Sequence, residues 1–338
     1  MLSAPSQVIL RNQDFFEQGN WLVANAPEAE IFTNLDRQRF SGFHQMFDVY
    51  QRCTNQAPEQ RHEFAACIDV KDAYDGAIIY MPKSKEHAQM LIQNMASCIK
   101  PDGLIYLVGE NKSGIKSADK LFKQVATQVN KVDSARHCAL YCAQTNKAVA
   151  FDLAKWVTYR DITVAETTVS VAFLPGVFSA GELDPGTRLL LENLPQTLKG
   201  DVLDFACGAG IIGCFLAKKH ENLQITFCDV SALAIHATEL TLEKNGFKGK
   251  VVPSNGLTSI SQRFNHVFTN PPFHTGIHTN YDVTQDFIAG IKNHLDPNAT
   301  LTLVANRFLP YPDQLKKSLG NVKTLAQTSK FNLYFSRA

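Results

Sequence analysis

The hexapeptide at residues 269–274, TNPPFH, combines residue types that could position a reacting group. Two consecutive prolines cannot donate ladder hydrogen bonds, so they must end the apolar strand predicted at residues 264–268. An amide, a backbone carbonyl and an aromatic ring at a strand end form a rigid polar clamp that fits a planar group bearing an NH2. We predict the catalytic residues to be Asn270, Pro271, Pro272 and Phe273.

A glycine-rich turn joins the strand predicted at residues 201–206 to a helix that begins near Ile211. Its pattern, Gly208-x-Gly210-x-x-Gly213, lets a ligand approach backbone amides closely. The next predicted strand ends at Asp229, where a carboxylate can bind the two ribose hydroxyls of an adenosine group. This combination does not separate a nicotinamide cofactor from S-adenosylmethionine. The clamp favours S-adenosylmethionine, since a hydride-transfer enzyme has no evident use for it.

We therefore predict that S-adenosylmethionine is held by Asp204, Ala206, Gly208, Gly210, Asp229, Val230, Asn255 and Gly256. Asp204 is expected on the methionine ammonium side, directly or through water, and Asn255 at the adenine edge. Further residues are expected close to the substrate: Phe178, Asp184, Thr187, His274 and Arg307. Phe178, Asp184 and Thr187 are read as covering the cofactor or base, or as an ordinary hairpin and helix cap. His274 is read as a proton acceptor or a structural loop histidine, because no strong base is required.

Composition narrows the classes of protein that the chain can belong to. A length of 338 residues predicts about two domains, and 33 basic against 32 acidic residues give no global sign of a polyanionic partner. No apolar run approaches the roughly 20 residues of a membrane span, and no basic leader is present, so we expect a cytoplasmic protein without a membrane partner. Eight cysteines without a C-x-x-C pair indicate reduced core thiols, and no metal site is predicted.

Alternating strands and helices predict a Rossmann-like α/β fold, and the two halves of the chain echo each other. Three segments align without gaps, namely 19–29 with 200–210, 74–83 with 264–273, and 101–111 with 297–307. In the first copy Val23 stands in place of Asp204, Pro27 in place of Gly208, and residues 80–83 in place of the clamp. We interpret this as a duplicated domain whose N-terminal copy is degenerate. Chance similarity of short apolar strands is the alternative.

Several motifs, taken together, resemble the ribosomal RNA small subunit methyltransferase C family, which methylates a guanine N2 in 16S rRNA. The motifs are VGENKSG at 108–114, DSAR at 133–136, PGVFS at 175–179, LDPGT at 183–187, the Asp204 loop and the clamp. The resemblance covers nearly the whole chain, although residues 329–332 read SKFN where the family pattern is GRFK.

This resemblance implies two tandem Rossmann-like class I methyltransferase domains. Residues 1–160 would form a degenerate copy that supports the structure and docks RNA, and residues 161–338 a catalytic copy with a seven-stranded sheet. S-adenosylmethionine would be the donor, 16S rRNA in the assembled 30S subunit the substrate, and the protein a monomer without a metal. Candidate RNA contacts are Lys112, Lys116 and Arg136, the two lysines lying in a loop that equally fits a solvated surface.

Three alternatives remain open on sequence grounds. The first is the related guanine-N2 enzyme of 23S rRNA, against which the Gly109 loop and the chain length argue. The second is N-methylation of adenine or of a protein glutamine, because the clamp recognises an NH2 and not guanine as such. The third is a noncatalytic RNA-binding ribosome-assembly factor, against which the intact Asp204, Gly208, Asp229 and Asn270 argue.

Overall fold

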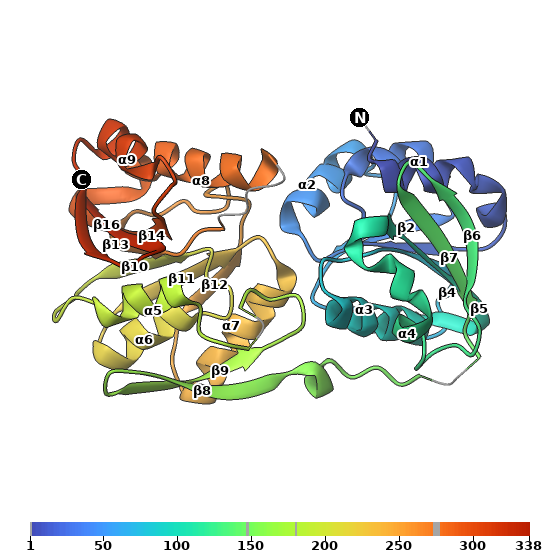
Figure 1. The fold of residues 1–338 in the computed structure, drawn as a ribbon, viewed down its shortest axis with the longest axis horizontal. Helices are drawn as coiled ribbons and strands as arrows, with labels where there is room; N and C mark the ends of the chain where they lie inside the picture. Colours follow the sequence, from blue (N-terminus) through green and yellow to red (C-terminus); the bar gives the residue numbers. More distant parts are fainter. Residues whose placement is uncertain (1, 147–148, 180, 273–277) are drawn as a thin grey trace. The chain divides into compact units, whose positions relative to one another are not determined.

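The chain divides into two compact units, Met1–Val157 and Thr158–Ala338, each with its own sheet (Figure 1). The computed structural model describes residues 2–146, 149–179, 181–272 and 278–338, and for residues 278–282 only the helical backbone. No helix in these ranges is both long and apolar enough to span a membrane.

The first unit is a seven-stranded sheet in the order β3-β2-β1-β4-β5-β7-β6, parallel except for the pairings of β7 with β5 and β6. Its strands are β1 Trp21–Ala24, β2 Phe40–His44, β3 His62–Phe64, β4 Tyr74–Tyr80, β5 Ile99–Glu110, β6 Asn130–Ala135 and β7 Cys138–Gln144. Its helices are α1 Ala4–Arg11, α2 Phe47–Gln56, α3 Lys85–Cys98 and α4 Ala118–Leu121, with 3-10 turns η1 Gln13–Phe16, η2 Ala29–Asn34, η3 Asn111–Ser113, η4 Ile115–Ser117 and η5 Leu153–Trp156. Helices α1 and α2 cover one face and α3 and α4 the other, which gives two apolar layers on either side of the sheet (Figure 1).

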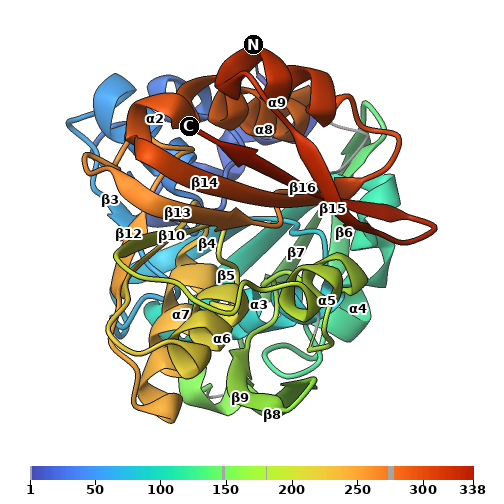
Figure 2. The same cartoon turned by 90° about the vertical axis from the view of Figure 1, so that its left-hand side faces the viewer.

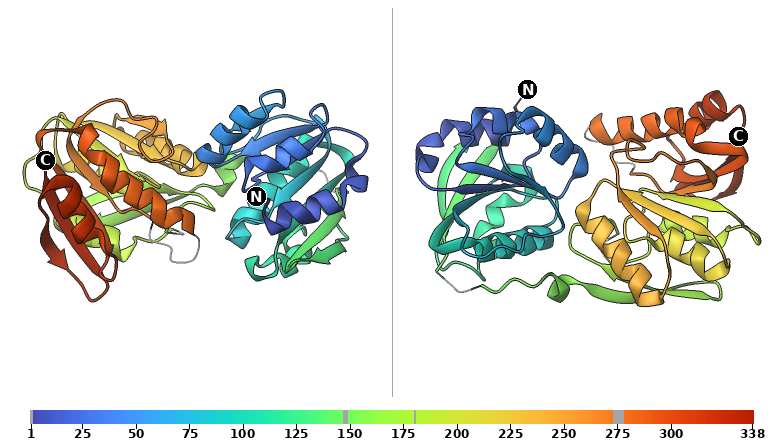
Figure 3. Two further views of the ribbon diagram at one scale, coloured as in Figure 1. Left: turned by 90° about the horizontal axis from the view of Figure 1, so that it is seen from above. Right: turned by 180° about the vertical axis from the view of Figure 1, so that it is seen from behind.

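The second unit opens with a hairpin, β8 Thr158–Val164 and β9 Thr167–Phe173, and continues as a seven-stranded sheet in the order β12-β11-β10-β13-β14-β16-β15. The strands of this sheet are β10 Asp201–Phe205, β11 Gln224–Asp229, β12 Lys250–Pro253, β13 Phe264–Thr269, β14 Leu295–Asn306, β15 Lys323–Gln327 and β16 Phe331–Arg337. Its helices are α5 Pro185–Glu192, α6 Ile211–Lys219, α7 Ala232–Asn245, α8 His278–Gly290 and α9 Tyr311–Leu319, with η6 Ile291–His294. Helices α8 and α9 lie on one face of the sheet and α5, α6 and α7 on the other (Figure 2). The same three-layer arrangement is visible within each unit from two further sides in Figure 3.

The two sheets share their irregularities as well as their strand order. In the first sheet Gly76 of β4 pairs with Leu104 of β5, and in the second the aligned His266 pairs with Thr300. The register shifts at the same place in both, between Tyr74 and Gly76 and between Phe264 and His266. The terminal hairpins also shift alike, between Lys131 and Asp133 and between Thr324 and Ala326. Because chance alignment of apolar strands would not reproduce two bulges, the predicted duplication of the domain is confirmed.

The core of the first unit contains a histidine that should make the protein sensitive to acid. His44 on β2 is 1% exposed, and burial, followed by the neighbouring His62, lowers its pKa to about 3. A histidine with a depressed folded pKa stays neutral in the native state while the unfolded chain takes up a proton below pH 6.5. We therefore expect stability to fall by about 2 kcal/mol between pH 7 and pH 5 from this group alone.

Urea unfolding of the full chain at the two pH values measures this loss. In the His44→Gln variant the difference between the two pH values should shrink. His236→Gln, which removes a partly exposed histidine of the other unit, should keep the wild-type difference. An unchanged pH dependence in His44→Gln would contradict the assignment.

Candidate active site

The carboxyl ends of β10, β11 and β13 bring the predicted site residues to one edge of the second sheet, because β10 pairs in parallel with both neighbours. After β10 the chain turns sharply into α6, with positive φ angles at Ala206 (55°), Gly208 (57°) and Gly210 (74°). A Cβ on Gly208 would meet nothing within 4 Å, whereas one on Gly210 would lie 2.9 Å from Thr238. The turn therefore packs against α7 on one side and leaves backbone exposed to open space on the other.

A hollow at this edge holds about 390 Å³ of empty space, part of it open to solvent. It brings together residues that the sequence predicted from three separate segments. The lining residues are Phe178, Ser179, Asp184, Thr187, Ala206, Cys207, Gly208, Ala209, Ile211, Ile212 and Asn270. Phe178, one of these lining residues, is 52% exposed.

The amide of Asn270 is held from one side only. Its Nδ2 donates to Asp184 Oδ2 at 2.9 Å and to Thr187 Oγ1 at 2.8 Å. Asp184 also caps α5, since the same Oδ2 accepts from the Thr187 backbone N–H at 2.9 Å. Asn270 Oδ1 is buried and has no hydrogen-bond partner among the described residues. It is therefore available to accept from an N–H group brought into the hollow.

Two carboxyl groups lie beneath the glycine turn. Asp204 is 0% exposed, and its Oδ2 accepts from Gly213 N at 2.8 Å, while Oδ1 has no partner among the described residues. Burial, with a smaller contribution from the charge of Asp229, raises the pKa of Asp204 to about 8. The Asp204 carboxyl is therefore largely protonated at neutral pH in the unliganded protein.

Asp229 braces the turn instead. Its Oδ2 accepts from Gly208 N and its Oδ1 from Ser231 N, both at 2.9 Å. Burial raises the pKa of Asp229, and the backbone hydrogen bonds from Ser231 and Gly208 act in the opposite direction. Each oxygen keeps a lone pair that a ligand hydroxyl could use.

The remaining predicted residues lie around or outside this hollow. Five predicted cofactor residues are not among those that line the hollow, namely Asp204, Asp229, Val230, Asn255 and Gly256. The backbone N–H of Ser254 donates to the Asp229 carbonyl oxygen at 2.9 Å, which connects the loop that contains Asn255 to β11. In the clamp, Pro271 is buried and Pro272 is half-buried. Arg307 is exposed, and its backbone N–H donates to the Lys330 carbonyl oxygen at 2.9 Å. Phe273 and His274 lie outside the described residues.

In the first unit, the three basic candidates lie on two segments that are bonded together. Lys112 and Lys116 follow β5, and Arg136 lies in the β6–β7 turn. Lys112 is exposed and forms an ion pair with Glu110 at 2.9 Å. Asn111 N donates to His137 O at 2.8 Å and so joins the loop to the turn.

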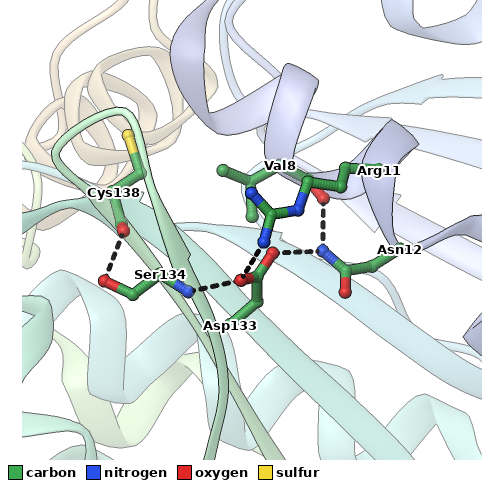
Figure 4. Close-up of polar contacts among 6 residues, drawn as sticks. All are labelled: Val8, Arg11, Asn12, Asp133, Ser134 and Cys138. Atoms are coloured by element: carbon green, nitrogen blue, oxygen red, sulfur yellow. Dashed lines mark hydrogen bonds and ion pairs between the residues drawn. The ribbon is translucent and has the colours of Figure 1, made fainter.

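Near this turn, strand β6 is fastened to the end of α1 through Asp133 (Figure 4). Asp133 accepts from Arg11 Nη2 at 2.9 Å and from Asn12 Nδ2 at 2.7 Å. Arg136 and His137 both have positive φ, 51° and 58°, which non-glycine residues adopt at a cost of about 1–2 kcal/mol each. Positive φ at both central residues is the geometry that a two-residue hairpin turn of the primed type requires.

Comparison with known proteins identifies the family. Residues 6–159 match the methyltransferase small domain N-terminal family, and residues 168–335 match the methyltransferase small domain family. The chain is 49% identical to the ribosomal RNA small subunit methyltransferase C of Pseudoalteromonas atlantica, covering 100% of both chains. The chain belongs to the ribosomal RNA small subunit methyltransferase C family. It is also 38% identical to the Escherichia coli (strain K12 / DH10B) member, over 97% of this chain and 95% of that one.

A solved structure shares the fold over both units. It is the T. thermophilus 16S rRNA N2 G1207 methyltransferase in complex with AdoMet and guanosine, with a TM-score of 0.86 and 22% identity over 99% of this chain and 92% of that chain. The tandem α/β architecture predicted from sequence is thus that of this family.

One residue that supports the site in this family member was missed by the sequence analysis. Thr238 on α7 is fully buried, donates from Oγ1 to Gly208 O at 3.0 Å and lies 3.4 Å from Cys207 Sγ. A single threonine inside a helix is indistinguishable in sequence from an ordinary packing residue, so no local signal could have found it.

The glycines of the turn should respond differently to a methyl group. In Gly213→Ala the new Cβ would lie 2.2 Å from Phe227 Cε1 and 3.1 Å from Asp204 Oδ2, so α6 would have to move away from the sheet. We expect a loss of about 2 kcal/mol in unfolding free energy, although alanine is otherwise the better helix former. In Gly208→Ala only the positive φ opposes the change, at about 1 kcal/mol.

Urea denaturation measures both losses. Gly246→Ala is the matched control, because Gly246 also has a positive φ (67°) and open space at its Cβ. Gly208→Ala and Gly246→Ala should lose similar stability. A Gly213→Ala variant as stable as the wild type would contradict the close approach of α6 to β11.

Two histidines and a cysteine in the first unit lie close enough together to hold a metal ion, but the two histidines hydrogen-bond to each other. His44, Cys53 and His62 each offer a ligand atom within 4.8 Å of the others. However, His44 Nε2 and His62 Nδ1 hydrogen-bond to each other at 3.1 Å, which places a proton on one of the two nitrogens. Burial raises the pKa of the Cys53 thiol to about 12. The three side chains are therefore neutral in the core, and His44 Nδ1 is buried without a hydrogen-bond partner among the described residues.

Proposed function

We propose that this protein transfers a methyl group from S-adenosylmethionine to the exocyclic N2 of a guanine in 16S rRNA. The observation that carries the proposal is the amide of Asn270, which lines a hollow beside the glycine turn and whose Oδ1 has no partner in the part of the chain that the structure describes. Membership of the ribosomal RNA small subunit methyltransferase C family supports the same reaction. The nucleotide named for the T. thermophilus relative, G1207, is the proposed target.

The chain offers a fitting place for the methyl donor. Gly208 and Gly210 have no side chains, and a Cβ on Gly208 would meet nothing within 4 Å. We assign Asp204 Oδ1 to the methionine ammonium group and Asp229 to the ribose hydroxyls. Asn255 is assigned to the adenine edge, and Ala206, Val230 and Gly256 to the walls. When bound, S-adenosylmethionine supplies an electrophilic methyl group on a sulfonium.

The work of the clamp is to activate a poor nucleophile. The lone pair of a guanine N2 is delocalised into the ring, so the amine must be turned before it can attack. Asn270 Oδ1 and the Pro271 carbonyl accept the two N–H groups, Pro272 keeps the turn rigid, and Phe273 stacks on the base. The N2–C bond forms as the S–C bond breaks. The proton on N2 becomes acidic once the methyl group is attached and leaves to solvent, so His274 is not needed as a base.

Other residues near the hollow are assigned to the substrate. Phe178 offers an exposed ring on the lining, which suits stacking with an extruded base. Arg307 is exposed next to Phe308, whose ring is 71% exposed, and this pair suits contact with RNA beyond the target base.

We propose a division of labour in which residues 1–160 dock the ribosomal RNA and residues 161–338 carry out methyl transfer. The joined loop and turn with Lys112, Lys116 and Arg136 would contact phosphates, and the substrate would be the assembled 30S subunit. The protein would act as a monomer in the cytoplasm, where ribosomal subunits are assembled.

The double variant Lys116→Glu/Arg136→Glu is expected to bind small subunits about tenfold more weakly and to show a smaller salt dependence, because two phosphate contacts are lost. Donor affinity should not change. Lys71→Glu, an exposed lysine in the loop that precedes β4, is the control. Unchanged affinity of the double variant for the subunit would count against docking at this surface.

The function is tested with isotope-labelled S-adenosylmethionine and three substrates from a methylation-deficient strain, namely small subunits, large subunits and free rRNA. Nucleoside analysis should find labelled N2-methylguanosine in 16S rRNA, with small subunits the best substrate. Label in 23S rRNA would support the large-subunit enzyme instead, and label on adenine or protein would overturn the guanine assignment. No transfer to any substrate would leave the RNA-binding assembly factor.

A further inference from the structure

The amide of Asn270 cannot rotate freely between its two orientations. Asp184 Oδ2 already accepts from Thr187 N at 2.9 Å and accepts again from Asn270 Nδ2 at 2.9 Å. A carboxylate oxygen only accepts, so turning the amide over would set Asn270 Oδ1 against it. Thr187 Oγ1, at 2.8 Å, takes the second N–H. Both amide hydrogens are therefore used inside the protein, and the oxygen is left for the ligand.

The first turn of the corresponding helix in the degenerate copy makes a similar contact, but with a different residue at the strand end. Within the gap-free alignment of the two halves, extended to the helix before β1, Ser3 and Ser6 correspond to Asp184 and Thr187, and Tyr80 corresponds to Asn270. Ser3 caps α1, and Ser6 Oγ hydrogen-bonds the buried Tyr80 hydroxyl at 2.8 Å. Both copies therefore have a contact between the helix start and the strand end. Only the second copy uses it to hold an amide.

The buried ring of Tyr80 and the side chain of Glu28 also occupy positions that line the hollow in the other unit. Glu28 corresponds to Ala209, and its Oε1 accepts from Ser3 N and Ser3 Oγ, both at 3.0 Å. In the first unit, the polar groups at the start of α1 therefore form hydrogen bonds with side chains of the same unit, Glu28 and Tyr80. In the second, the polar atoms at the helix start converge on one amide whose oxygen has no partner within residues 2–146, 149–179, 181–272 and 278–338.

We propose that Asp184 and Thr187 are positioning residues that fix the polarity of the Asn270 amide so that Oδ1 accepts from the substrate amine. Asp184 has a second effect through the same bond. A hydrogen bond from the amide N–H to a carboxylate polarises the amide and makes its oxygen a stronger acceptor. That acceptor is needed most when the attacking nitrogen gains positive charge. The inference rests on the proposed function and explains why the site selects an N–H donor over a carbonyl.

Steady-state kinetics of the full-length protein on small subunits tests this. Thr187→Val, which keeps the shape and removes the hydroxyl, should lower kcat about tenfold, and Thr187→Ser should restore it. Asp184→Asn keeps a good helix cap and should lower kcat about a hundredfold, with KM and Kd for the donor unchanged. Ser84→Ala removes the cap of α3, where Ser84 Oγ accepts from His87 N at 3.1 Å, and should leave kcat unchanged.

The deciding measurement is a double-mutant comparison in the Asn270→Ala background. If Asp184 and Thr187 act through the amide, Thr187→Val and Asp184→Asn cause no further loss of kcat there. Equal losses in the presence and absence of Asn270 would overturn the proposal, as would a wild-type kcat in both single variants. If Thr187→Val does not fold, the Asp184→Asn and Thr187→Ser results still decide. A wild-type protein inactive on guanine N2 would instead defeat the proposed function.

Discussion

Replacement of Asn270 by alanine is expected to lower methyl transfer by about a hundredfold or more without loss of the fold or of donor binding. The substitution removes the unpartnered Oδ1 and with it the acceptor proposed for the substrate amine. It also frees Asp184 and Thr187, which remain bonded to each other through the helix cap. Because the amide makes no other hydrogen bond to the described residues, stability should change little.

Single-turnover assays with saturating donor isolate the chemical step. Asn265→Ala is a matched control at the opposite end of the same strand, where the amide bonds Asp201 N at 2.8 Å and Asp296 Oδ2 at 3.1 Å. That variant should lose stability and keep its rate below the unfolding temperature. Near-normal turnover by Asn270→Ala would sink the clamp mechanism.

Much of the fold could be predicted because many strands are followed in the sequence by residues that end a strand. Apolar runs ended by Pro-Pro, by glycines or by Asp229 mark the carboxyl ends of parallel strands, and these ends meet at one edge of the sheet. The repeat was visible for the same reason, since Tyr74 and Phe264 begin strands of the same character. The structure adds the shared register shifts, which depend on pairing between strands and are invisible in a single run of residues.

The sequence predicted which residues belong to the site more completely than it predicted the hydrogen bonds between them. Asp184 was read either as a helix cap or as a residue covering the ligand, and it both caps α5 and holds Asn270. The two residues are 86 positions apart, so only the packing of α5 on the sheet brings them together. Thr238 was missed because its role depends on a contact with the glycine turn, and its own segment shows only helical spacing.

In the first copy, a methyltransferase-type sheet carries a tyrosine where the second copy has the amide that lines the hollow. Ala206 and its counterpart Asn25 keep the same positive φ, 55° and 56°, so the strand ending is retained. Tyr80 then fills the space where a small amide would leave an acceptor free, and its hydroxyl is satisfied by Ser6. Burial of an aromatic ring stabilises such a copy by roughly 2–3 kcal/mol. The residue that stands in place of Asn270 therefore contributes to the core of the first unit.

Asp204→Asn is expected to weaken binding of S-adenosylmethionine by about thirtyfold or more, since truncating one partner of a buried charged pair costs about 2–5 kcal/mol. The wild-type carboxyl has a pKa of about 8 before the donor binds, raised mainly by burial. Binding of a cationic ammonium group next to Oδ1 would ionise it, so a proton should be released. Between pH 6 and pH 8 the wild-type affinity should therefore rise with pH, and that of Asp204→Asn should stay flat.

Stability of the unliganded protein should change with the opposite sign. A carboxyl with a raised folded pKa takes up a proton on folding, so its contribution to stability is complete below pH 3.8 and is lost as the pH rises to about 8. Wild-type stability should accordingly fall from pH 6 to pH 8, and Asp204→Asn should lack this component. Isothermal titration calorimetry in buffers of different ionisation enthalpy measures the proton release, and urea unfolding measures stability. Asp201→Asn, at the start of the same strand, is the control. Donor affinity in Asp204→Asn equal to that of the wild type, with the same pH dependence, would remove Asp204 from the donor site and leave it as a buried partner of Gly213.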